Sequence, residues 1–315
     1  MSQFINGLIS GIALGGIYAV IALGFVIVYR ATHTLNFAQG AVVTLGAYVT
    51  YLLSGPIRGL KFDNPPSLLH LPYWVALLIA MVLMGGFGWL LEVLVIRRFR
   101  GRPVFAIIMA TLGVGTIMGA LMNVVWGTSP VNLVTPFGTK PRHPLGNIRV
   151  SDVDIATLVI ILSIAVAFFF GFQRSKLGTA MKATAFDQEA AIAQGISPKV
   201  IFGASWALSC ALATLAGVLL ASGAGSVATQ VSPGLGLFAL VGFPAIVLGG
   251  VDSLEGAVLG GLIIGIVQAL SATYESKIER YVGNEFWKLT PYLLMIAVLL
   301  VRPSGLFGTK EVRRV

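Results

Sequence analysis

The residues that could carry out chemistry in this sequence are few, and they lie far apart along the chain. The three histidines, His33, His70 and His143, fall in expected loops or at their edges, and the single cysteine, Cys210, lies inside an apolar stretch. The sequence contains no G-x-x-x-x-G-K-S/T phosphate loop, no H-E-x-x-H zinc motif and no C-x-x-C pair. We therefore expect a chain that is not an enzyme, holds no metal and binds no cofactor of its own.

Glu92 is the one acidic residue inside an otherwise uncharged apolar stretch, residues 72–96. Carriers driven by protons or sodium usually keep ionisable residues near the bilayer midplane, because only function justifies their cost there. Glu92 instead precedes Arg97 by a little more than one helical turn. We expect it to pair with a neighbouring arginine at the inner membrane interface rather than to act in transport.

A second group consists of uncharged polar residues in or at the ends of apolar stretches. Such groups can line a transport pathway, but they can equally hydrogen-bond one helix to another. The candidates for a pathway are Asn36, Gln39, Thr44, Asn123 and Gln268.

The composition identifies the environment in which these residues must be positioned. The 315 residues are 57% hydrophobic and 10% charged, whereas a soluble domain is about half apolar and about a quarter charged. The net charge of +9 comes from Arg and Lys in short loops beside apolar stretches, where they set membrane topology rather than bind nucleic acid. The chain is therefore expected to be an integral membrane protein in the lipid bilayer, with no separate catalytic domain and no energy source of its own.

The elements follow from the uncharged stretches. Nine of them occur, at about 4–29, 36–54, 72–96, 104–126, 155–172, 200–222, 236–250, 256–273 and 290–301. Helices are the open-chain structures that satisfy their own backbone in lipid, so we expect an all-α, polytopic bundle of about eight to ten transmembrane helices. Residues 1–315 form one domain. The stretch 36–54 carries Asn36, Gln39 and two glycines, and a broken or partly re-entrant helix is an alternative there.

Clusters of basic residues set the expected orientation. The loop 97–102 carries four arginines, and the C-terminal tail adds Lys310, Arg313 and Arg314. Both clusters are expected in the cytoplasm. Alternation then places the loop 173–199 inside, the longer loops 55–71, 127–154 and 274–289 outside, and the N-terminus outside.

Glycine is frequent inside the apolar stretches, as in 11–16, 84–88, 112–120 and 256–265. Small residues at four-residue spacing let helix backbones approach closely in lipid. The pattern predicts a tightly packed bundle.

One water-soluble segment, "KLGTAMKATAFDQEAAIAQGISPK" (176–199), interrupts the apolar stretches. Thr184 is a candidate N-cap, with Asp187 three residues later, and Gly195 suits the left-handed position after a helix. These signals predict a short helix from about Ala185 to Gln194. Ser197 and Pro198 then begin the next helix.

This short helix is amphipathic and acidic. Phe186 and Ala190 lie along one expected face, while Asp187 and Glu189 offer polar contacts. So short a helix needs a partner surface, and its acidic, alanine-rich character suits a groove on a cytoplasmic protein better than a membrane surface. Packing against its own bundle remains the alternative.

The run "DQEAAIAQGI" resembles the cytoplasmic coupling segment of ABC-importer permeases. Further blocks at 7–48, 91–103, 216–221 and 243–270 resemble the branched-chain amino-acid permease family, in its LivH-like branch, and the resemblance spans essentially the whole chain. By this resemblance, the residues implied in coupling to an ATPase are Ala185, Phe186, Asp187, Glu189, Ala190, Ala191 and Gly195.

The resemblance also implies partners and a location. They are a second homologous permease subunit, two cytoplasmic ATPase subunits that use ATP, and an extracytoplasmic substrate-binding protein, in a bacterial cytoplasmic (inner) membrane. The implied cargo is branched-chain or related amino acids. Two departures from the family pattern, Ala41 and the run 240–243, keep urea or short-chain amides open as cargo. A stand-alone channel or secondary carrier is a further alternative.

Overall fold

The computed structural model describes residues 2–54, 69–133, 135–137, 142–145, 148–172, 174–226 and 228–308. Most of the expected outer loop 55–71 and the basic residues of the C-terminal tail lie outside these ranges.

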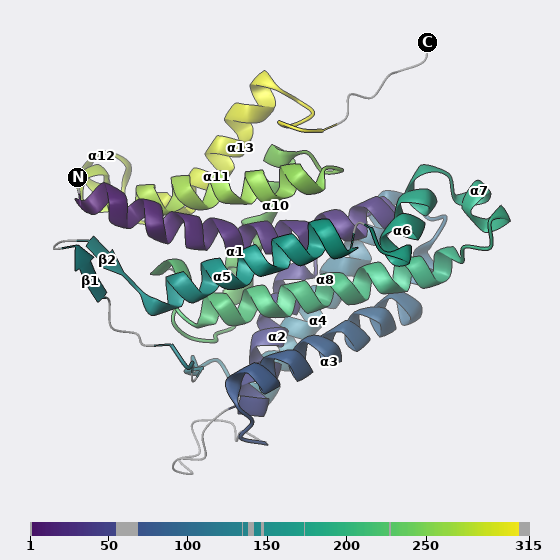
Figure 1. Cartoon of the computed structure of the whole chain (residues 1–315), viewed down its shortest axis with the longest axis horizontal. Helices are drawn as coiled ribbons and strands as arrows, with labels where there is room; N and C mark the ends of the chain where they lie inside the picture. The colour runs from purple at the N-terminus through teal and green to yellow at the C-terminus, as the bar shows by residue number, and fades with distance from the viewer. Residues whose placement is uncertain are drawn as a thin grey trace.

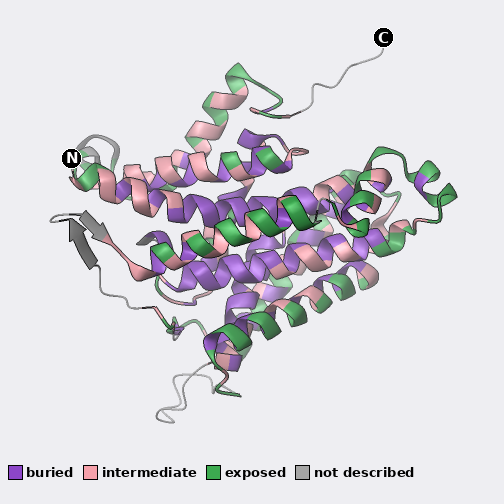
Figure 2. Ribbon diagram, viewed as in Figure 1, coloured by how far each residue is buried: buried purple, intermediate pink, exposed green. Residues whose placement is uncertain are grey.

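Helix α1 (Ser2–Thr32) runs through the centre of the bundle (Figure 1). Its sequence is apolar on all sides, as expected of a helix surrounded by others, and most of its length is buried (Figure 2). It packs against α5 (Asp152–Val166), α8 (Pro198–Ala221), α10 (Gly242–Gly249) and α11 (Leu254–Thr273). This helix therefore connects the two ends of the molecule.

Glycines bring α1 and α11 into backbone contact. A Cβ built on Gly265 would lie 2.1 Å from the Gly15 Cα, and one built on Gly261 would lie 2.4 Å from the Ala19 N. No side chain fits at such separations. The predicted close packing through small residues is thus confirmed for this pair of helices.

The long helices form a bundle. Within the described residues, six helical segments are long and apolar enough to cross a membrane: Ser2–Thr32, Tyr73–Phe99, Val104–Trp126, Asp152–Gly171, Pro198–Ala221 and Leu254–Thr273. The second of these comprises α3 (Tyr73–Leu94) and the short helical turn η1 (Ile96–Phe99), and α4 spans Val104–Trp126. A wider turn, η2 (Ala167–Phe172), follows α5. The predicted polytopic helical bundle is confirmed.

Shorter helices fill the remaining apolar stretches. They are α2 (Gln39–Ser54), α9 (Leu235–Leu240), α10 and α13 (Thr290–Val301). The 16 residues of α2 span about 24 Å at about 1.5 Å per residue, less than the hydrocarbon core of about 30 Å. Its first turn meets that of α9, because a Cβ on Gly40 would lie 2.7 Å from the Gly236 carbonyl oxygen.

The two ends of the bundle carry different structures (Figure 1). At one end, beside the start of α1, strands β1 (Arg142–Leu145) and β2 (Ile148–Val150) pair antiparallel, with Arg142 opposite Val150. The chain also forms α12 (Glu275–Val282) and the turns η3 (Ala224–Ser226) and η4 (Phe286–Lys288). The opposite end carries α6 (Lys176–Phe186) and α7 (Gln188–Ala193). We call these the hairpin end and the α7 end; the sequence did not predict the hairpin.

Candidate functional site

The polar segment at the α7 end forms two helices rather than the single one predicted. Asp187 caps α7: its Oδ1 accepts hydrogen bonds from the Glu189 N at 2.9 Å and the Ala190 N at 3.0 Å. The extended backbone at Asp187 (φ −150°, ψ 109°) ends α6 and begins α7. The prediction that Thr184 caps the helix is wrong. Thr184 lies inside α6, where its hydroxyl donates to the Ala180 carbonyl at 2.8 Å.

The other predicted boundaries of this segment are confirmed. Gly195 has a φ of +80°, a left-handed conformation that a side chain would strain. The Ile196 N donates to the Ala191 carbonyl at 3.0 Å and so closes the end of α7. Pro198 stands in the first turn of α8, after Ser197 as predicted. The segment is therefore a corner of two short helices with defined caps.

Most of the residues implied in coupling lie on the outer surface of this corner. Phe186, the last residue of α6, is 96% exposed. Asp187, Glu189, Ala190 and Gly195 are also exposed. Ala185 is half-buried, and Ala191 is buried on the side of α7 that faces the bundle. A partner could thus reach an aromatic ring and two carboxylates without moving the corner.

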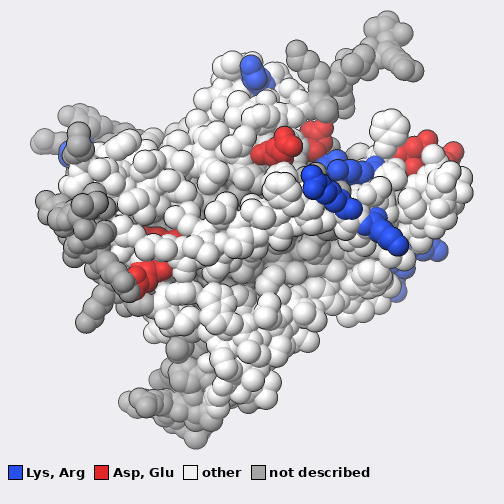
Figure 3. Space-filling view, viewed as in Figure 1, with Lys and Arg blue, Asp and Glu red and all other residues white. Residues whose placement is uncertain are grey.

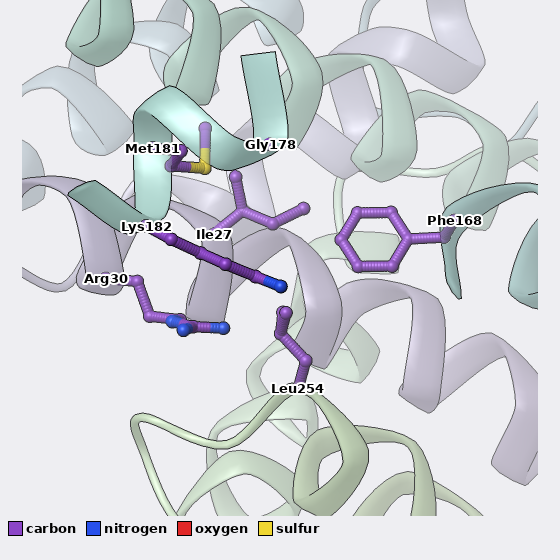
Figure 4. A pocket seen from close by; sticks show the side chains of 7 residues that line it. All are labelled: Ile27, Arg30, Phe168, Gly178, Met181, Lys182 and Leu254. Atoms are coloured by element: carbon purple, nitrogen blue, oxygen red, sulfur yellow. The ribbon is translucent and has the colours of Figure 1, made fainter. Parts of the chain in front are cut away.

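The base of α6 packs into the bundle beside a small hollow (Figure 4). Arg30 from α1 and Lys182 from α6 line it, together with Phe168, Met181 and Leu254. The two basic side chains point the same way in Figure 4. Figure 3 shows Lys and Arg gathered at the α7 end, with acidic side chains beyond them. Through this hollow, α6 meets α1 and the start of α11.

Glu92 is fully buried at the end of α3. It accepts a hydrogen bond from Arg97 at 2.7 Å and pairs with Arg100, whose guanidinium also lies 4.2 Å from the centroid of the Phe202 ring on α8. Burial lowers the pKa of Arg100 from its ordinary value, and the nearby Glu92 carboxylate opposes that shift. The expected pairing of Glu92 with a neighbouring arginine is confirmed.

Two of the predicted pathway residues, Asn36 and Gln39, contact each other, whereas Asn123 and Gln268 lie on other helices. The side chain of Asn36 donates to the Gln39 Oε1 at 3.0 Å, and the Ser209 hydroxyl donates to the same oxygen at 3.3 Å. All three residues are fully buried, at the junction of α2 with α8. Thr44 is buried too and donates to the Gly40 carbonyl of its own helix. Of these contacts, the one between Ser209 and Gln39 joins two helices, as polar groups in membrane bundles often do.

Asn123 and Gln268 lie elsewhere. Asn123 is exposed near the end of α4, whereas Gln268 on α11 is buried and lines a large cavity.

This cavity, of about 870 Å³, lies at the hairpin end. Its wall is formed by the first turns of α1 and α5, the end of α8 with the segment after it, and the C-terminal part of α11. Residues of the loop before the hairpin complete it. The polar lining residues include Asn6, Ser10, Asn132, Thr135, Ser151, Asp154, Ser222, Thr229, Gln268 and Thr273. Apolar lining residues include Leu14, Leu133, Val153, Ala221, Ala269 and Trp287. The mixture suits a small ligand with both polar and aliphatic parts.

A profile of the family described as "Branched-chain amino acid transport system / permease component" matches residues 7–299. The chain belongs to this permease family. It is 29% identical to the high-affinity branched-chain amino acid transport system permease protein LivH of Escherichia coli (strain K12), over 99% of this chain and 98% of that protein. It is 28% identical to the corresponding protein BraD of Pseudomonas aeruginosa, over 99% and 98%.

More distant matches exist. The permease is 27% identical to LivM of Escherichia coli (strain K12), over 92% of this chain and 67% of that protein. Among solved structures, PsaBC from Streptococcus pneumoniae in complex with Fab matches with 14% identity and a TM-score of 0.46, over 96% of this chain and 91% of that chain.

Sequence reasoning missed one buried acidic residue of this permease. This residue is Asp154, which lies in the first turn of α5, two residues after Asp152, and is 4% exposed. Its Oδ1 accepts a hydrogen bond from the Gly225 N at 2.9 Å. The sequence assigned it to an outer loop as one of several acidic residues. A signal was available, because Ser151 before an apolar run marks a helix start, which places Asp154 inside the first turn rather than in the loop.

Proposed function

We propose that this permease is the membrane-spanning subunit of an ATP-binding-cassette importer for branched-chain amino acids, and that separate ATPase subunits drive it. The observation that carries this proposal is the corner of α6 and α7, which presents Phe186, Asp187 and Glu189 on an exposed, capped surface. The sequence contains no phosphate loop, so ATP is used by partners. No cofactor is required on this chain.

The α7 end is proposed to face the cytoplasm. Arg and Lys side chains gather there (Figure 3), in agreement with the bias of basic residues toward the cytoplasmic side of membrane proteins. The chain segment at Phe307 and Gly308 packs against Gly249 and Gly250 at this same end, which supports a cytoplasmic C-terminus. The cavity at the hairpin end then opens toward the extracytoplasmic side, where a binding protein would deliver substrate.

A second homologous permease is proposed as the partner within the bacterial inner membrane. The chain matches both LivH and LivM, two differently named permease proteins of Escherichia coli. Helix α4 exposes large apolar side chains along its length, among them Phe105, Ile117 and Val124. Such a face suits lipid or a second membrane subunit.

Branched-chain amino acids are the proposed cargo because the relatives' names describe transport of these substrates. The departures at Ala41 and 240–243 lie on α2 and across the junction of α9 and α10, and none of these residues lines the cavity. They therefore give no physical reason to prefer urea or amides.

Reconstitution tests the proposal. The chain is purified with its co-expressed partners, placed in proteoliposomes and supplied with radiolabelled leucine. We expect uptake that requires ATP and the binding protein, and that excess isoleucine or valine, but not urea or acetamide, competes away. Leucine flux through the chain alone, without ATPase subunits, would instead indicate a channel or secondary carrier.

A further inference from the structure

We propose that the cavity at the hairpin end is a transient binding site for the amino acid inside the permease, with Asp154 receiving the substrate's α-ammonium group. This inference rests on the proposed function and adds to it the residues that hold the cargo.

The position of Asp154 is the first argument. Asp154 as a whole is 4% exposed, yet it belongs to the wall of a cavity of about 870 Å³, within the range of about 300–1,000 Å³ typical of small-molecule sites. One oxygen, Oδ1, accepts the Gly225 N–H. Among the described lining residues there is no Lys, Arg or His. A buried carboxylate is costly unless a cation or several donors face it, so the missing counter-charge points to a cationic ligand.

Gln268 provides a second, independent observation. It comes from α11, is 1% exposed and lines the same cavity. Its side chain neighbours the Tyr18 hydroxyl of α1, and within the part of the chain that the structure describes neither that hydroxyl nor the Gln268 Oε1 has a hydrogen-bond partner of good geometry. A buried acceptor without a donor is unfavourable, and an ammonium group supplies three donors. A carboxylate and an amide oxygen in one cavity wall both favour an ammonium ligand.

The rest of the wall fits the remainder of an aliphatic amino acid. Asn132 accepts the Gln230 amide through its Oδ1 at 3.0 Å, which leaves its own amide nitrogen to donate to a carboxylate. Hydroxyl groups of Ser10 and Thr229 add further donors. Leu14, Leu133 and Trp287 offer an apolar surface for a branched side chain.

The competing explanation is that Asp154 serves only to hold the turn η3. Gly225 has a φ of +68° and would be too close to Leu14 if it carried a side chain, so this turn needs an anchor. The substitution Asp154→Asn separates the two roles. Asparagine keeps an oxygen that accepts the Gly225 N–H, but it carries no charge for an ammonium group. Asp154→Ala removes both.

The experiment uses the complete transporter in proteoliposomes, and it measures leucine uptake and ATP hydrolysis in the same vesicles. We expect Asp154→Asn to lower the leucine taken up per ATP hydrolysed at least tenfold, with ATP hydrolysis within twofold of wild type. Gln268→Met, which removes the second acceptor, should lower the same ratio. The matched control is Asp152→Asn, which removes a carboxylate from the same helical turn but outside the cavity lining; it should change neither quantity.

The outcomes separate the two proposals. If the wild type imports leucine and Asp154→Asn keeps the ratio within twofold, the binding site is wrong and the importer function stands. If Asp154→Ala lowers uptake and ATP hydrolysis together while Asp154→Asn lowers neither, the residue serves only the turn. If the wild type shows no ATP-dependent leucine uptake, the proposed function fails and this site fails with it.

Discussion

Phe186 offers a sharp test of the coupling surface because its ring packs against almost nothing within the chain itself. It is 96% exposed, so Phe186→Ala should change the free energy of unfolding by no more than about 0.5 kcal/mol, as is usual for surface positions. If an ATPase groove buries the ring, its loss costs about 1.5–3 kcal/mol of binding. At about 1.4 kcal/mol per tenfold change, the affinity for the ATPase falls about 10- to 150-fold.

Binding of the purified ATPase subunit to the permease in lipid nanodiscs measures this directly. Phe4→Ala is the matched control, since Phe4 is also exposed but lies near the start of α1, at the opposite end. We expect the control to bind the ATPase like wild type. Both variants should insert and unfold thermally like wild type. In proteoliposomes, Phe186→Ala should lose leucine uptake in proportion to its loss of ATPase binding.

An unchanged affinity for Phe186→Ala would refute the reasoning. It would favour the alternative that the sequence left open, in which this segment only packs against its own bundle. Charge reversal at Asp187 and Glu189 should also uncouple ATP hydrolysis from uptake, and Glu189→Lys alone tests the charge because Asp187 also caps α7.

Three further predictions concern the framework. Asp187→Ala removes the cap of α7 and should cost about 0.5–2 kcal/mol locally, seen as faster hydrogen exchange in the first turn of α7. Gly265→Ala places a Cβ 2.1 Å from the Gly15 Cα, so overpacking should cost about 1–3 kcal/mol in thermal unfolding. Glu92→Gln removes the charge shared by two arginines that are each 31% exposed; partial exposure should hold the cost below the 3–5 kcal/mol that is roughly typical of breaking a fully buried pair.

Each of these predictions has a result that contradicts it. Unaltered exchange in Asp187→Ala would mean that α7 is held by packing rather than by its cap. Gly119→Ala, where an added Cβ would meet no other element of the described chain within 4 Å, is the control for Gly265→Ala, and equal unfolding temperatures for the two would exclude overpacking. A Glu92→Gln variant as stable as wild type would show that the arginines find other partners or water.

Much of the fold could be predicted because membrane helices are bounded by strong local signals. The predicted stretches 104–126 and 290–301 coincide with α4 and α13. Pro103 precedes the first of them, and Gly127, at a φ of +75°, follows it. A proline before a helix and a left-handed glycine after it act on the backbone directly.

The cap at the α7 end could not be predicted because two residues suit the same role. Thr184 and Asp187 are both good N-cap residues in sequence. Packing decides between them: Thr184 is buried within α6, where its hydroxyl bonds back along the helix, whereas Asp187 is exposed and free to turn toward two amides. The surroundings of the pathway candidates could not be predicted for a similar reason. Whether a polar side chain meets another helix or a cavity depends on neighbours that are distant in sequence, as Gln39 and Gln268 illustrate.

The two proposed sites are joined by the same pair of helices. Near its C-terminus α1 lines the hollow at the base of α6 through Ile27 and Arg30, and near its N-terminus it lines the cavity through Ser10 and Leu14. Helix α11 runs in the opposite direction: its first residue, Leu254, lines the hollow, and Gln268, nearer its C-terminus, lines the cavity. Because glycine contacts leave no space between them, α1 and α11 should tilt together rather than slide apart. A push on α6 and α7 by an ATPase would then reach the parts of the cavity wall that α1 and α11 form, whereas Asp154 belongs to α5, outside this pair. Motion of the pair relative to α5 would change the distance between Gln268 and Asp154, the two proposed acceptors, and so weaken the proposed site.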